Sequence, residues 1–194
     1  MTTEAKEIFN YAFQLFDEVF APKMREWGLK IHPPRRSDYE IEWLVESKNG
    51  HLTRIFMVLY EPYGVGIYED VVDKAIIRVY NDDWAERVRK RLCEVVGDAI
   101  LNLSGKEIKK SYGIPYHVLR GGVLLPKVAS KEGYPEIFAY FKITPKRLTW
   151  RWRVVVYHGK RTVMHASETK SLETKDPVEV FRQLFKAAMA TTLL

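Results

Sequence analysis

Basic and aromatic residues alternate in one short stretch of this chain. Residues 147–161 have the sequence RLTWRWRVVVYHGKR, in which arginines separate two tryptophans and three valines follow. Guanidinium groups bind phosphate oxygens, and exposed aromatic rings stack on the bases of single strands. The pattern is therefore typical of a nucleic-acid surface. It is also typical of a strand that buries its tryptophans and turns its arginines to water.

The tryptophans belong to the core in the strand register that we expect. Strands at 136–143 and 148–158, joined by a four-residue turn, place Phe141 opposite Trp150 and make every pair on that face apolar. Trp152 shares this face, because side chains two residues apart point in the same direction. We therefore predict that both tryptophans are buried and that neither contacts a ligand.

Aromatic and cationic side chains share the opposite face of these two strands. The same register places Tyr140 opposite Arg151. It also places Phe138 opposite Arg153. Such a face stacks bases and binds phosphates, so we predict a non-enzymatic protein that holds single-stranded DNA or RNA. The predicted nucleic-acid-binding residues are Phe138, Tyr140, Lys142, Arg151, Arg153, Lys160 and Arg161.

The composition fits a folded, basic protein. The chain has 194 residues, a formal net charge of +6 and a pI of about 9.3, which permits attraction to phosphate. Its single cysteine, Cys93, excludes an internal disulfide and a zinc cluster built on cysteines. Six amide side chains stand among many lysines, arginines and glutamates, a balance that indicates a thermophilic source.

The sequence does not predict a membrane-spanning segment or an export signal. No segment reaches the roughly 18 uninterrupted apolar residues of a membrane span. The first segment, MTTEAKEIFNYAFQLF, carries acidic residues where a signal peptide would be basic. We therefore expect a cytoplasmic protein without a membrane partner.

A second candidate for nucleic-acid binding lies at residues 104–122. Its sequence, SGKEIKKSYGIPYHVLRGG, resembles the two-helix core of a helix-turn-helix. The second helix would contact the DNA major groove through Tyr116, His117 and Arg120. The two glycines at 121–122 would end that helix early, so a short helix followed by a basic loop is the alternative.

Catalytic and metal-binding patterns are weak. Glu168, Lys170, Glu173 and Lys175 have the E-x-K spacing of some metal-dependent nucleases. Such a site needs another carboxylate on a neighbouring strand to hold Mg²⁺, and the strand at 148–158 offers none. The histidines share no metal-binding spacing, and no phosphate-binding or dinucleotide-binding glycine motif is present. We therefore assign no catalytic residue, metal or cofactor.

Helical and strand periodicities alternate along the chain. Apolar residues at helical spacing predict helices at 3–20 and 84–103, and a third helix follows Asp176. Asp83 and Asp176 would cap the second and third of these helices. The fold class that follows is α+β, with antiparallel β-meanders, helices packed on one face and a long C-terminal helix. We expect one domain over 1–194, and sub-units 1–103 and 104–194 remain an alternative.

A hairpin at Asn49-Gly50 suggests other function classes. A two-residue turn there would place Trp43 opposite Phe56. A small-ligand binder would need an enclosed pocket lined by Trp43, Phe56 and Phe141. A structural or assembly protein would instead cover its aromatic and arginine face with another subunit, so a homodimer is left open.

Overall fold

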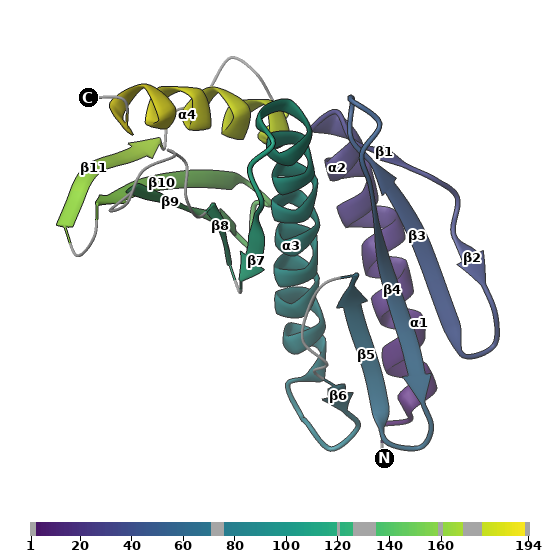
Figure 1. Cartoon of the computed structure of the whole chain (residues 1–194). Coiled ribbons are helices and arrows are strands. Elements are labelled where there is room, and N and C mark those ends of the chain that lie inside the picture. Colours follow the sequence, from purple (N-terminus) through teal and green to yellow (C-terminus); the bar gives the residue numbers. More distant parts are fainter. Residues whose placement is uncertain are drawn as a thin grey trace.

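A long central helix separates two antiparallel β-sheets in the computed structural model of this chain (Figure 1). The structure describes residues 3–70, 76–119, 121–125, 135–158, 161–168 and 176–192. Both sheets are meanders, and helices pack on one face of each, which confirms the predicted α+β class. No helix in these ranges combines the length and hydropathy that a membrane span requires.

The first sheet, sheet A, forms the amino-terminal half. Its strand order is β1-β3-β4-β5-β6, with β2 paired beside β3. The strands are β1 (Lys30–Ile31), β2 (Arg35–Arg36), β3 (Glu40–Glu46), β4 (Leu52–Tyr60), β5 (Gly64–Glu69) and β6 (Ile76–Arg78).

The second sheet, sheet B, forms the carboxyl-terminal half and has the order β11-β10-β9-β8-β7. Its strands follow one another in sequence, as expected for a meander. They are β7 (His117–Leu119), β8 (Gly122–Leu125), β9 (Pro135–Ile143), β10 (Trp150–His158) and β11 (Arg161–Glu168).

The first predicted helix continues beyond residue 20. A single π-helical turn after its first segment leads into a further segment of α-helix, which contains Pro22 near its start. Gly28, with a φ of 92°, follows the end of this helix. The three segments are α1 (Ala5–Leu15), η1 (Phe16–Phe20) and α2 (Ala21–Glu26).

The β3–β4 hairpin differs from its predicted register by one residue. Its turn spans three residues, 48–50, and ends in Gly50 with a φ of 83°. Trp43 therefore lies opposite Ile55, while Phe56 lies opposite Glu42 on the other face. A shift of one residue exchanges the two faces of a strand, so the predicted Trp43–Phe56 pair is wrong. Trp43 is fully buried and packs against Phe16, with ring centroids 4.4 Å apart.

The central helix, α3 (Trp84–Tyr112), is longer than predicted. It passes through residues 103 and 104 and ends at Gly113, whose φ of 68° suits the left-handed position after a helix. All residues from Val95 to Gly105 are buried, because the two sheets cover the helix from different sides. Asp83 occupies the N-cap position, as predicted, but its carboxylate accepts from Arg87 at 2.7 Å and makes no capping hydrogen bond.

The predicted helix-turn-helix is also wrong. Residues 104–112 continue α3, and His117–Leu119 form strand β7 where the second helix was expected. Pro115 follows two residues after Gly113, and proline has no amide hydrogen to continue a helix. The chain then turns back along α3. The ring of Tyr116 lies over Gly105, where a β-carbon would stand only 2.2 Å from it.

A buried polar network crosses the centre of the molecule. Asn102 of α3 donates to the Glu69 carboxylate at 2.9 Å and to the Thr53 hydroxyl at 3.2 Å. Thr53 also donates to Glu69. On the other side, the Tyr116 hydroxyl donates to the Asn102 side-chain oxygen at 2.9 Å. The network therefore joins strands β4 and β5 of sheet A to the segment that enters sheet B.

The last helix, α4 (Pro177–Thr192), covers the inner face of sheet B. The predicted cap is confirmed, since the Asp176 carboxylate accepts from the Val178 amide at 3.0 Å and the Glu179 amide at 3.4 Å. Trp152 is fully buried beneath this helix. Its ring stacks on Phe181 with centroids 4.6 Å apart, and its Nε1 donates to the Pro177 carbonyl at 2.7 Å.

Candidate nucleic-acid interface

Strands β9 and β10 divide their side chains between two faces as the alternation predicts. Phe141 and Trp152 are buried and Trp150 is half-buried, all on the face toward α3 and α4. Tyr140 and Arg153 are exposed on the opposite face. The predicted nucleic-acid-binding residues of β9 and β10 all lie on this second face. They are Phe138, Tyr140, Lys142, Arg151 and Arg153, and we call them the sheet-B platform.

The strand register differs from the predicted one by two residues. Tyr140 lies opposite Arg153, and Arg151 lies opposite Lys142. The cause is the turn, which spans 144–149 and is two residues longer than expected. It is closed by a hydrogen bond from the Thr144 amide to the Thr149 carbonyl at 2.8 Å. Because a shift of two residues leaves every side chain on its own face, the composition of each face is unchanged.

Two aromatic rings form the apolar part of the sheet-B platform. The rings of Phe138 and Tyr140 have centroids 4.4 Å apart and are inclined at 53°. Tyr140 is 40% exposed, and Phe138 is half-buried. Gly122 on β8 leaves room for this arrangement, because a β-carbon there would stand 2.8 Å from the Phe138 ring. The platform therefore presents one exposed ring and a half-buried ring beside it.

Cations border these rings. The Arg153 guanidinium carbon lies 5.9 Å from the centre of the Tyr140 ring, within cation–π range. Lys142 and Arg151 are both exposed on neighbouring strands. Among the outward-facing described residues of β9 and β10, Glu136 is the single carboxylate, so three cations and one anion leave a formal charge of +2.

Two further basic residues lie next to the sheet-B platform and were not predicted as part of it. Lys146 and Arg147 are exposed in the β9–β10 turn, immediately beyond Lys142 and Arg151. The turn is held to α3 by Arg89, whose Nε donates to the Pro145 carbonyl at 2.8 Å. Adjacent basic residues in a hairpin turn were the sequence signal that could have identified them.

The last two predicted nucleic-acid-binding residues lie at the connection between β10 and β11, where residues 159–160 are outside the described ranges. Lys160 lies outside the described residues, and Arg161 begins β11 opposite His158. The register between β10 and β11 shifts after Val156, where the strand pairing is irregular. The predicted contribution of Lys160 and Arg161 to phosphate binding stays a prediction.

The other candidate sites do not assemble among the described residues. Lys170, Glu173 and Lys175 of the nuclease pattern lie outside the described ranges, and within those ranges no cluster of His, Cys, Asp or Glu could hold a metal ion. The predicted lining of a ligand pocket is also not brought together. Trp43 and Phe56 lie on opposite faces of sheet A, and Phe141 belongs to sheet B.

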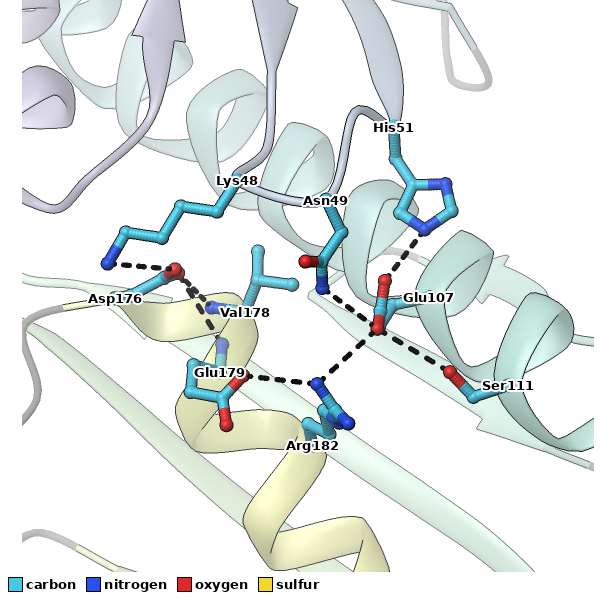
Figure 2. Close-up of polar contacts among 9 residues, drawn as sticks. All are labelled: Lys48, Asn49, His51, Glu107, Ser111, Asp176, Val178, Glu179 and Arg182. Carbon is cyan, nitrogen blue, oxygen red and sulfur yellow. Dashed lines mark hydrogen bonds and ion pairs between the residues drawn. The ribbon is translucent and has the colours of Figure 1, made fainter.

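A polar cluster near the carboxyl-terminal end of α3 holds separate elements together. The Glu107 carboxylate, whose side chain is 7% exposed, accepts from Asn49 at 3.0 Å and pairs with His51 at 2.7 Å (Figure 2). Arg182 of α4 lies 3.8 Å from it, and Ser111 also contacts it. The cluster thus ties the β3–β4 turn and α4 to α3. Asn49 and His51 are separated from Glu107 by 58 and 56 residues in the sequence, so no local pattern predicts these contacts.

Asp176 makes the stability of the protein depend on pH in an identifiable direction. Burial raises the pKa of this carboxyl, although its two amide donors and Lys48 act in the opposite direction. A carboxyl with a raised pKa holds its proton more tightly in the folded state, so its ionisation costs stability as the pH rises from about 4.

We expect Asp176→Asn to remove this cost, because the asparagine oxygen still caps α4. The free energy of unfolding of the variant, relative to the parent, should increase as the pH rises from about 4 toward neutrality. Urea unfolding at a series of pH values measures this difference. Parallel pH profiles for the two proteins would show that Asp176 titrates alike in the folded and unfolded chains.

Comparisons with known proteins identify no relative: no family model matches the chain, and neither a curated protein nor a solved structure matches it significantly. A proposal for its function therefore depends on the residues of the sheet-B platform and their geometry.

Proposed function

We propose that this protein binds single-stranded DNA or RNA on the sheet-B platform. The observation that carries the proposal is the exposed Tyr140 ring with the Arg153 guanidinium 5.9 Å from its centre and further cations on both neighbouring strands. The described helices that pack on sheet B lie against its other face, and Tyr140, Lys142, Arg151 and Arg153 are exposed.

The platform supplies the two interactions that single strands require. Tyr140, with Phe138 beside it, offers ring surface on which bases stack, and each stacked base contributes about 1–3 kcal/mol to binding. Lys142, Arg151 and Arg153 offer positive charge to the phosphates. Each neutralised phosphate releases counterions, so affinity should fall steeply as salt is added. Stacking has little sequence preference, so we propose no base specificity.

The charge of the platform also bears on the alternative of an assembly protein. A symmetric dimer brings the same patch of two copies together. Arg151, Arg153 and Lys142 of one copy would then face the same cations of the other, which repel one another. The charge therefore favours an anionic partner over a second copy of the platform.

We expect Arg151→Ala/Arg153→Ala to weaken binding of a fluorescent single-stranded oligonucleotide by at least about tenfold at low salt. Two phosphate contacts are lost, and the dependence of log affinity on log salt should become shallower by roughly 1.4, or about 0.7 for each contact. Fluorescence anisotropy at several salt concentrations measures both quantities. The matched control is Lys109→Ala/Lys110→Ala, which removes two exposed cations from the last turn of α3.

The outcome separates specific binding from general attraction to a basic protein. An equal loss in the control variant would show that net charge, and not the platform, attracts the oligonucleotide. An absence of binding by the parent protein at low salt would exclude the proposed function. Thermal unfolding of both variants should match the parent, since the substituted side chains are exposed.

A further inference from the structure

Three tyrosines are far more exposed than any other large apolar or aromatic side chain in the described part of the chain. Tyr39, Tyr63 and Tyr80 are exposed by 62%, 63% and 72%, whereas the next largest value is 42%. They belong to three different turns, at 37–39, 61–63 and 79–83. These turns lie at the end of sheet A near the amino terminus of the chain (Figure 1). We call the three turns together the tyrosine end.

Backbone hydrogen bonds join the tyrosine end into one edge. The Tyr39 carbonyl accepts from the Leu59 amide at 2.8 Å, at the end of β4. The Tyr63 amide donates to the Tyr60 carbonyl at 2.7 Å, and the Tyr63 carbonyl accepts from the Val79 amide at 3.0 Å. The three exposed tyrosines thus come from adjoining turns whose backbones are fixed relative to sheet A.

The charge of the tyrosine end is opposite to that of the whole protein. Its three turns contain four carboxylates and neither lysine nor arginine, in a chain with a net charge of +6, and two exposed arginines, Arg36 and Arg78, immediately precede two of the turns. Asp83 is paired with Arg87. The others, Asp38, Glu61 and Asp82, are exposed and form no ion pair with a described residue. Exposed rings beside exposed carboxylates are complementary to cations.

We propose that the tyrosine end is a docking surface for a partner protein, which it binds through an extended segment rich in lysine and arginine. The rings contact ammonium and guanidinium groups, and the carboxylates pair with them. Tyrosine provides a large contact area at a low cost in side-chain entropy, which suits it to protein interfaces. Nucleic acid is repelled by the same carboxylates, so this surface is separate from the sheet-B platform in both place and partner.

The test uses a short fluorescent peptide in which lysine and arginine alternate with serine, and the whole protein at low salt. We expect binding, with affinity lowered roughly tenfold by Tyr63→Ser/Tyr80→Ser and by Glu61→Gln/Asp82→Asn. The first variant keeps the carboxylates, and the second keeps the rings. The matched control is Glu18→Gln/Glu136→Gln, which removes two exposed carboxylates from other elements and should bind as the parent does.

Three results would overturn the proposal. One is equal binding of a peptide with glutamate in place of each lysine and arginine, and another is an equal loss of affinity in the control variant. The third is self-association of the parent in sedimentation experiments that Tyr63→Ser/Tyr80→Ser abolishes, which would make a second copy the occupant. Failure of oligonucleotide binding leaves this test unaffected, because the substitutions and the probe differ.

Discussion

Trp152→Ala should lower the free energy of unfolding by about 3–5 kcal/mol, a large part of the stability of an ordinary domain. The Trp152 ring is fully buried between Phe141 and Phe181, with centroids 4.7 Å and 4.6 Å away. Truncation leaves a cavity under α4 and removes the hydrogen bond to the Pro177 carbonyl. Chemical unfolding followed by circular dichroism measures the loss.

The companion variant Tyr140→Ala distinguishes the two faces of the same hairpin. Tyr140 is 40% exposed, so its truncation should change the free energy of unfolding by less than about 1 kcal/mol. Under the proposed function the same variant weakens oligonucleotide binding by about 1–3 kcal/mol. If Trp152→Ala were as stable as the parent, the burial of the tryptophan face of β10 would be contradicted.

Asn102→Leu should cost about 3–5 kcal/mol of unfolding free energy, although leucine is close to asparagine in size. The substitution withdraws a donor from the Glu69 carboxylate, which is 2% exposed, and from the Thr53 hydroxyl. It also withdraws the acceptor of the Tyr116 hydroxyl. Buried polar groups that lose their partners keep the cost of desolvation without the compensating hydrogen bond. Equilibrium unfolding in urea measures the effect.

A double-mutant cycle with Tyr116→Phe tests whether the network is the cause. Tyr116→Phe alone removes one hydrogen bond and should cost about 1 kcal/mol. The double variant should lose less unfolding free energy than the sum of the two single-variant losses. The reason is that Tyr116→Phe has already removed the hydroxyl that Asn102→Leu would leave unpaired. If Asn102→Leu cost no more than Tyr116→Phe, the network would contribute little to stability.

The sequence predicted the two faces of the β9–β10 hairpin but not its register. Because side chains alternate between faces with a period of two, Tyr140 and Arg153 share one face for any register shift by an even number of residues. Turn length is set by the local backbone, and here Leu148 is buried with a φ of 49°, a conformation that no pattern in the sequence indicates. In the β3–β4 hairpin the error was one residue, so the predicted partner of Trp43 moved to the other face.

The parts that the sequence did not predict depend on contacts between distant residues. The end of α3 is nine residues beyond its predicted position, because Ser104 and Gly105, which look unfavourable for a helix, are buried against Tyr116 and the sheets. The Glu107 cluster and the Asn102 network join residues from separate elements. The three turns of the tyrosine end are likewise brought together only by the pairing of sheet A.

The burial of α3 on every side over Val95–Gly105 determines how this protein can lose its structure. Sheet A also packs against α1 and sheet B also packs against α4, while α3 packs against both sheets. If one half came apart while the other stayed folded, a long apolar stripe of the helix would be left in water. Partial unfolding is therefore costly for both halves, and we expect the chain to unfold in a single cooperative transition.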